Sequence, residues 1–314
     1  MKELIKAILP TPLKQKISSM RAKGAIRLEA SRTIRPTDIF LVGHPKSGNT
    51  WVAFMLSVIL SEKMGNKVTM ANVSNFVPNL HTRGVRIKTY NDLPSPRIFR
   101  NENPRWHDYY PKTIYLVRDP RAVFLSYYHH WLHTEQTIHG SLEDFVDELL
   151  EYGCIRRWET WLVGWDQQVN DWVERAKRQP VKIVRYEDLV EDRGKTFREI
   201  VDFADLRCSE SLVELAIKQG AFEAMQRNEK SYGAESFHGQ KSIKGLFVRK
   251  GRVDSWKEEM PDHVSEKIGR QFQETMELFG YLKPGEKFKK SPSPVVLSYP
   301  SKNSSHARPE KIFH

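Results

Sequence analysis

Three short runs of apolar residues stand out in this chain, and each is followed by a longer segment with apolar residues at helical spacing. The runs lie at 38–43, 113–117 and 181–184, and the helical segments at 50–64, 120–133 and 193–204. Continuous apolar runs are typical of strands buried on both faces. Because strands that alternate with helices indicate a parallel sheet, the pattern predicts an α/β fold with helices on both faces of that sheet. Ser141, followed three residues later by Asp144, predicts the start of a further helix.

The chain divides into three parts by pattern. Residues 1–36 form a basic leader in which apolar residues at 4, 5, 8 and 9 recur at helical spacing, with lysines on the other side. Such a leader can pack on the main domain or attach peripherally to an anionic membrane surface. Prolines at 10 and 12 keep each helical piece short. Residues 37–282 form the expected main domain, and the tail 283–314 is rich in Lys, Pro and Ser, which predicts mobility.

Composition narrows the class of protein. The 314 residues contain no apolar run of the roughly 18–20 residues that a spanning helix needs. The lysines and prolines of the leader argue against a secretory signal. The two cysteines, Cys154 and Cys208, cannot form a disulfide framework, so we expect a cytoplasmic protein, with the leader allowing a position at the inner face of a membrane. The net charge of +11 indicates anionic partners without naming them.

The first apolar run ends in Gly43-His-Pro-Lys-Ser-Gly-Asn-Thr-Trp51, just before a predicted helix. A strand–loop–helix turn directs backbone N–H groups and a helix N-terminus at a phosphate. Gly43, Gly48 and Thr50 match the G-x-x-x-x-G-K-[ST] loop of nucleotide triphosphatases, but Asn49 occupies the lysine position. The lysine stands earlier, at position 46, which predicts an anionic ligand of different geometry from that of an ATPase or kinase.

This segment resembles the opening motif of the cytosolic sulfotransferase family, P-K-S-G-T-T-W, with one departure at Asn49. The resemblance implies a P-loop-type fold and 3′-phosphoadenosine-5′-phosphosulfate (PAPS) as sulfuryl donor, with no metal. The asparagine amide can still donate a hydrogen bond to an oxyanion. By this resemblance, the 5′ side of the donor would be held by Pro45, Lys46, Ser47, Gly48, Asn49, Thr50 and Trp51.

Two further segments resemble the family's 3′-phosphate site. In Tyr115–Tyr128, Arg118 and Ser126 match the strand-end arginine and the helix serine of the family. A guanidinium and a hydroxyl are suitable phosphate ligands. Near the end of the chain, Arg249, Lys250 and Gly251 match the start of the R-K-G-x-x-G-D-W-K loop. The second glycine of that loop is missing, because Asp254 and Ser255 stand in its frame, so we expect a different turn after Gly251.

The resemblance continues through R-Y-E-D at 185–188, a Trp-containing helix at 164–172 and A-F-E-A-M at 221–225, so that it spans residues 37–282. It implies that four aromatic residues surround the adenine: Trp51, Tyr186, Phe222 and Phe247. Aromatic faces suit a purine ring. The family's dimerisation signature is not evident after Trp256, which leaves the oligomeric state open.

Sulfuryl transfer requires a base for the acceptor proton and positive charge at the bridging oxygen, a role for Lys46. Aligning Pro96–Pro104 with the family's P-R-x-x-K-T-H-x-P segment places Arg100 on the lysine and Glu102 on the histidine base. A second alignment makes Tyr90 the base, but tyrosine titrates near 10 and would need a large pKa shift. We favour Glu102, as carbohydrate-modifying members of the superfamily use glutamate, and keep His107 in reserve. No clustered metal ligands are evident.

The sequence thus predicts in-line transfer of a sulfuryl group from PAPS to an acceptor hydroxyl, of a glycan, a glycolipid, or a small alcohol or phenol. Two other functions fit the chain less well. A P-loop kinase would have a lysine directly after Gly48, where this chain has Asn49. A nucleic-acid-binding module would need aromatic residues along a basic groove. The basic residues gather instead at strand ends that suit one small polyanion, so we expect no nucleic-acid partner.

Overall fold

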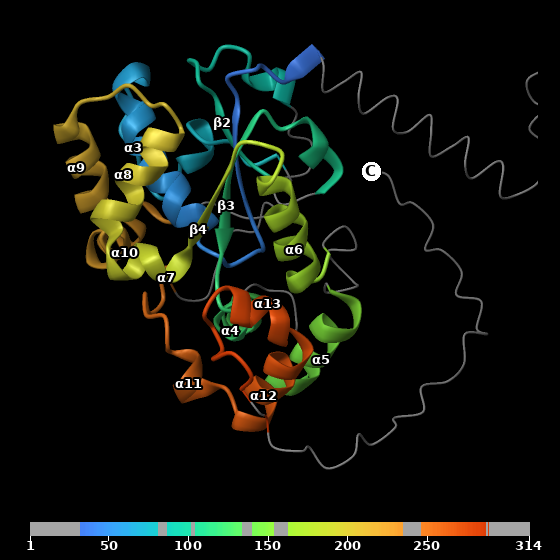
Figure 1. The fold of residues 1–314 in the computed structure, drawn as a ribbon. Coiled ribbons are helices and arrows are strands. Elements are labelled where there is room, and N and C mark those ends of the chain that lie inside the picture. Colours follow the sequence, from blue (N-terminus) through green and yellow to red (C-terminus); the bar gives the residue numbers. More distant parts are fainter. Residues whose placement is uncertain are drawn as a thin grey trace, which may run out of the picture.

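The computed structural model describes residues 32–80, 87–101, 104–133, 140–153, 163–234, 246–286 and 288. Most of the leader and most of the tail lie outside these ranges. Within them, the chain forms a four-stranded parallel sheet in the order β2–β1–β3–β4 (Figure 1). The strands are β1 (Ile39–Gly43), β2 (Ile98–Arg100), β3 (Lys112–Val117) and β4 (Val181–Arg185).

Helices cover both faces of this sheet (Figure 1). The α-helices are α3 (Asn49–Met64), α4 (Pro120–His133), α5 (Leu142–Tyr152), α6 (Trp165–Ala176), α7 (Tyr186–Glu191), α8 (Arg193–Phe203), α9 (Glu210–Gln219), α10 (Phe222–Tyr232), α11 (Trp256–Glu259), α12 (Asp262–Gln271) and α13 (Gln273–Leu278). Three short 3₁₀ helices are η1 (Val73–Asn75), η2 (Ile87–Tyr90) and η3 (Pro104–Tyr109). In the described ranges, no helix is long and apolar enough to cross a membrane.

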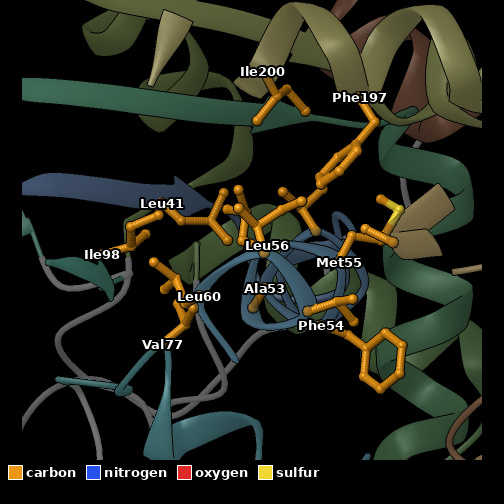
Figure 2. Packing of buried hydrophobic residues seen from close by; sticks show 14 of the residues in the cluster. Leu41, Ala53, Phe54, Met55, Leu56, Leu60, Val77, Ile98, Phe197 and Ile200 are labelled. Atoms are coloured by element: carbon orange, nitrogen blue, oxygen red, sulfur yellow. The ribbon is translucent and has the colours of Figure 1, made fainter. Parts of the chain in front are cut away.

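Strand β1 separates two hydrophobic cores, because successive side chains of a strand point to opposite faces. Ile39 and Leu41 belong to the core under α3, α8 and α9. Phe40 and Val42 belong to the core under α4, α5, α6 and α12. Figure 2 shows the first core, where Leu41 lies among side chains of α3 and α8. The continuous apolar run of the sequence is therefore explained by burial on both faces.

The structure confirms the three predicted strands and the α/β fold, with boundaries shifted by one residue at most. The predicted helix start at Ser141 is confirmed as well. Its hydroxyl accepts a hydrogen bond from the backbone N–H of Asp144, and the Asp144 carboxylate accepts one from the backbone N–H of Ser141. The sequence analysis missed β2, which is a strand of only three residues.

A buried ion pair ties β2 to the start of β1. Arg97 donates from Nε and Nη2 to the two carboxylate oxygens of Asp38, at 2.8 and 2.5 Å, and both side chains are fully buried. The same guanidinium donates to the carbonyl of Thr33. Because Arg97 is engaged on the amino side of the sheet, this first arginine of the P-R-x-x-K segment has a structural role.

Candidate functional site

A cavity of about 380 Å³ lies at the carboxyl edge of the sheet. Its wall combines the turn between β1 and α3, the first two turns of α4, the start of α7, the start of α10 and the loop 247–252. All the predicted donor contacts except Ser47 line it, namely Pro45, Lys46, Gly48, Asn49, Thr50, Trp51, Arg118, Ser126, Tyr186, Phe222, Phe247, Arg249, Lys250 and Gly251. The fold thus gathers segments that are up to about 200 residues apart in the chain around one space.

The turn between β1 and α3 contains two residues with positive φ. Lys46 has φ 72° and Gly48 has φ 104°, both in the region that L side chains rarely adopt. A Cβ on Gly48 would lie 2.9 Å from Cδ2 of Tyr186. Only glycine therefore fits here, between the strand and the first turn of α3. The helix N-terminus faces the cavity, which is the arrangement that binds phosphate.

Two polar side chains of this turn are buried. Asn49 donates from Nδ2 to the carbonyl of Gly43, at 3.2 Å, so one of its amide hydrogens holds the end of the strand. The Ser47 side chain is fully buried, and its hydroxyl has no hydrogen-bond partner among the described residues. We expected both groups to serve the ligand directly. The structure shows that the asparagine also closes the turn.

Arg118 connects this turn to β3. Its Nη1 donates to the carbonyl of Lys46 at 2.9 Å, and its guanidinium carbon lies 4.0 Å from the centre of the Tyr186 ring. Its own carbonyl accepts a hydrogen bond from Nε1 of Trp165, at 3.1 Å. Among the described residues, Nε of this guanidinium has no partner. A buried donor left unpaired beside a cavity fits an anionic ligand.

The loop 247–252 lies against the start of α10 and is held through its backbone. The Glu229 carboxylate accepts the N–H groups of Phe247 and Val248, at 2.5 and 2.9 Å. Gln226 donates to the carbonyl of Val248 at 3.1 Å. Gly251 has φ 64°, and a Cβ there would lie 2.4 Å from the ring of Phe222. The loop therefore depends on a close approach that only glycine allows.

Two of the three basic side chains of this loop, Arg249 and Lys250, meet a single carboxylate. Glu259 accepts from Nη1 of Arg249 at 3.0 Å and from Nζ of Lys250 at 2.5 Å. Its other oxygen lies 2.8 Å from Nε2 of His129 on α4. Partial burial alone would raise the pKa of Glu259, but the hydrogen bonds from Lys250, Arg249 and His129 outweigh burial and lower the pKa to about 2.

The predicted adenine contacts come together on one side of the cavity. The rings of Trp51 and Tyr186 lie 5.5 Å apart at 62°, and Nε1 of Trp51 donates to the carbonyl of Gly220 at 2.8 Å. Nζ of Lys46 lies 4.4 Å from the centre of the Phe247 ring. The aromatic side chains and the turn at 45–50 are therefore neighbours, an arrangement that suits a nucleotide.

Two of the predicted catalytic residues, Arg100 and Glu102, come from the segment 96–104, and the structure describes only Arg100. Glu102 lies outside the described residues. Arg100 is buried on β2, where it donates to the carbonyl of Val77 at 3.2 Å and to the hydroxyl of Ser74 at 2.7 Å. It is not among the described residues that line the cavity. Its catalytic role therefore stays a prediction from the motif.

The other two candidate bases, His107 and Tyr90, are described, and neither lines the cavity. His107 is buried, with its ring 4.7 Å from that of Trp172 and Nδ1 4.0 Å from Asp171. Burial lowers the pKa of His107, which keeps the ring neutral. Within the described ranges, no group of three His, Cys, Asp or Glu side chains could hold a metal ion.

The sequence analysis missed several residues of this site. His130 lines the cavity one helical turn after Ser126, a spacing that places both on the same side of α4. Glu229 and Glu259 hold the loop 247–252, although neither stood out as a motif. The spacing of Ser126 and His130 can be recognised in the sequence, whereas the contacts of Glu229 and Glu259 with the loop cannot.

Comparison with known proteins places these features in a family. A model of the sulfotransferase domain matches residues 36–280. An amine sulfotransferase of Oryctolagus cuniculus is 30% identical over 261 residues, which cover 78% of this chain and 83% of that protein. Sulfotransferase 1E1 of Bos taurus is 28% identical over 258 residues, which cover 77% of this chain and 84% of that protein.

Solved structures share the fold. Mouse sulfotransferase SULT7A1, complexed with PAP, has a TM-score of 0.61 and 21% identity, and the match covers 83% of this chain and 90% of that one. Retinol dehydratase, in complex with androsterone and inactive cofactor PAP, has a TM-score of 0.59 and 18% identity, over 80% of this chain and 85% of that one. The predicted parallel sheet flanked by helices is thus shared with these proteins.

Proposed function

This chain belongs to the sulfotransferase family, and on that premise we propose that it transfers a sulfuryl group from PAPS to an acceptor hydroxyl. One observation carries the proposal. A single cavity is lined by a phosphate-binding turn, by Arg118 and Ser126, by the Arg249-Lys250-Gly251 loop, and by aromatic side chains between them. A bisphosphorylated purine nucleotide has this distribution of charge and ring.

Each part of the cavity suits one part of the donor. The turn at 45–50 would bind the 5′ group, with Lys46 supplying positive charge to the bridging oxygen as negative charge develops there. Arg118, Ser126 and the loop 249–251 would bind the 3′-phosphate. Trp51 and Tyr186 would contact the adenine. These assignments rest on the lining of the cavity and on the motifs.

In the reaction, the sulfur–oxygen bond to the nucleotide breaks as the bond from sulfur to the acceptor oxygen forms, and the acceptor loses its proton. We propose that Glu102 takes that proton. Its support is its position in the motif, two residues after the end of β2, a strand that runs parallel to β1. Carboxylates are ionised at neutral pH and need only modest desolvation to become effective bases.

The proposed base is tested by Glu102→Gln, which keeps the shape of the side chain and removes its basicity. We expect transfer to fall at least a hundredfold, in line with the usual contribution of a general base, about 10²–10⁴. Affinity for 3′-phosphoadenosine-5′-phosphate (PAP) should not change. Full activity in this variant would rule Glu102 out, and His107→Ala would then be the next variant to assay.

The acceptor class is open to direct test. A glycan, a glycolipid, or a small alcohol or phenol remains our proposal, and the similarity to a rabbit amine sulfotransferase adds amines to the panel. Purified enzyme would be assayed with radiolabelled PAPS against one representative of each class. A glycan preference would fit a carboxylate base. Transfer only to amines would replace the hydroxyl in the proposal by nitrogen.

The donor is the first thing to measure. PAP would be titrated into the protein by calorimetry, with ATP and magnesium as the comparison. We expect tight PAP binding that is lost in Arg118→Ala and Lys250→Ala, because each substitution removes a cation from the cavity wall. Clear ATP binding without PAP binding would instead favour a kinase.

The basic leader, residues 1–36, is a separate proposal. We propose that it contacts anionic membrane surfaces, because its lysines and its apolar residues fall on different sides of a helical pattern. Sedimentation with vesicles of phosphatidylserine and phosphatidylcholine tests this proposal by comparing the full chain with a shortened chain that begins at residue 32. Equal sedimentation of the two proteins would contradict it.

A further inference from the structure

Glu259 occupies an unusual position for a carboxylate, beside a cavity proposed to bind anions. It receives hydrogen bonds from Arg249 and Lys250, which line that cavity, while Glu259 itself is not among the lining residues. Of the Arg249 guanidinium, only Nη1 is used in the contact with Glu259. The remaining donors of the arginine, and two hydrogens of the Lys250 ammonium, can therefore face a ligand.

The same carboxylate also contacts α4, a helix that contributes Ser126 and His130 to the wall of the cavity. Its second oxygen pairs with His129, which lies on α4 three residues after Ser126. Glu259 is the last residue of α11, so it bridges the basic loop, α11 and α4. Apart from Arg118, the proposed 3′-phosphate ligands come from the two outer members of this bridge, the loop and α4. A single side chain thus connects the two elements.

Two opposite effects of such a carboxylate are possible. Its negative charge opposes a phosphate nearby, and by charge alone its removal would tighten PAP binding. Its hydrogen bonds, in contrast, fix two long, flexible cations before the ligand arrives, which removes an entropic cost from binding. Glu259 pairs with two cations, Arg249 and Lys250, so the three side chains together keep a positive charge that still attracts a phosphate. The positioning effect should therefore dominate.

We propose that Glu259 is a positioning residue that holds Arg249 and Lys250 against α4 in the arrangement that recognises the 3′-phosphate. This inference rests on the proposed donor site. By holding these two cations, the Glu259 carboxylate contributes to the preference of that site for a 3′-phosphorylated nucleotide.

The test compares PAP with adenosine 5′-monophosphate, which lacks the 3′-phosphate. In Glu259→Gln, we expect PAP affinity to fall about tenfold, as for one displaced charge-assisted hydrogen bond, and affinity for the monophosphate to stay unchanged. A general loss of structure would lower both affinities. Unchanged or tighter PAP binding would overturn the inference, because either result means that the cations need no carboxylate to position them.

Glu258→Gln is the matched control, because it changes the same charge on the same helix. Glu258 pairs with Arg252 at 2.7 Å and lies 3.6 Å from Lys250, without contact to His129 or Arg249 among the described contacts. It should keep the wild-type preference for PAP. If wild-type protein itself binds PAP no better than the monophosphate, the proposed donor site fails, and this outcome is distinct from failure of the role of Glu259.

A second variant guards against misfolding of Glu259→Gln. His129→Gln retains the carboxylate and weakens only its link to α4, so PAP affinity should fall by about threefold, consistent with loss of one partner of several. The double variant should lose no more than Glu259→Gln alone, because both act through one bridge. Fully additive losses would show that the two residues act separately and would contradict the bridge.

Discussion

The two halves of the donor cavity are built in different ways. The turn at 43–51 depends on its backbone conformation, with positive φ values at Lys46 and Gly48, and it is held between β1 and α3. The loop at 247–252 contains no helix or strand, and carboxylates hold it: Glu229 through its backbone and Glu259 through its side chains. One half is positioned by the fold, and the other by hydrogen bonds and ion pairs with carboxylates.

This difference teaches where each half is vulnerable. A backbone cradle tolerates little change in shape, because its donors are part of the chain and its neighbours are the packed sheet. A loop held by carboxylates depends in addition on charge and therefore on pH and salt. Distorting the backbone turn should therefore lower PAP affinity more than removing one of the carboxylates that hold the loop.

The largest effect is expected for Gly48→Ala. Its Cβ would meet Tyr186 at 2.9 Å, in a backbone conformation, φ 104°, that alanine adopts at a cost of about 1–3 kcal/mol. We expect PAP affinity, measured by calorimetry, to fall about a hundredfold, since relief of this strain moves the turn that binds the ligand. Affinity within threefold of wild type would show that the turn is not rigid.

Gly65→Ala is the control for this substitution. Gly65 also has a positive φ, of 68°, but it follows the far end of α3, and a Cβ added there would meet nothing within 4 Å. The substitution should lower the midpoint of thermal unfolding without changing PAP affinity. Equal loss of binding in both variants would mean that stability alone, not the turn, determines affinity.

An intermediate effect is expected for Glu229→Gln in the second half. The amide oxygen can accept only one of the two N–H groups of Phe247 and Val248 well, and leaving a buried donor unpaired costs about 1–3 kcal/mol. We expect the free energy of unfolding to fall by that amount and PAP affinity to fall about tenfold. Denaturant titration and calorimetry measure the two quantities.

Glu214→Gln on α9 provides the comparison for Glu229→Gln. Glu214 is 65% exposed, and within the described part of the chain it pairs only with Arg198, at 3.9 Å, so the substitution should change neither quantity. If Glu229→Gln behaved like Glu214→Gln, the loop would have to be held by something other than this carboxylate.

The contrast between the halves also explains what could be predicted from sequence. The strands β1 and β3 are apolar runs because both their faces are buried, whereas the edge strand β4 is only partly buried. The strands are parallel, so their carboxyl ends share one edge. The ligand-binding turn follows directly along the chain from such a run. For this reason, the fold and the place of the turn at 43–51 could be predicted from local pattern together with a family motif, and its binding of phosphate stays a prediction.

The remaining features could not be predicted because they depend on tertiary contacts. Strand β2 has three residues and ends in Arg100, so its apolar pattern is too short to recognise. Glu229 meets the N–H of Phe247 across 18 residues of chain, and His129 meets Glu259 across 130. No spacing rule connects such pairs. From sequence alone, a charged residue on a helix is interpreted as exposed to solvent, because only the packed structure shows its partner.

The smallest effect is expected from acid, and it should be confined to the second half. The pKa of Glu259 is lowered to about 2 in the folded protein from an ordinary value of 4.5, so its ionisation stabilises the folded state. The sign follows from the lowered pKa: this contribution is complete above about pH 4.5 to 5 and is lost as pH falls towards 2. The thermal midpoints of wild type and Glu259→Gln, measured from pH 6 to pH 3, should therefore converge on acidification.

The charged groups around Glu259 decide how cleanly this convergence can be measured. Arg249, Lys250 and His129 are present in both proteins, so the difference between the proteins reports the carboxylate together with its contacts to these three side chains. Gly48→Ala provides the opposite case, because backbone N–H groups do not titrate, and its gap from wild type should stay constant over the same range. A constant gap for Glu259→Gln as well would mean that the ion pairs of the loop contribute nothing to folding, and the division of the cavity into a backbone half and a charge-held half would then apply to ligand binding alone.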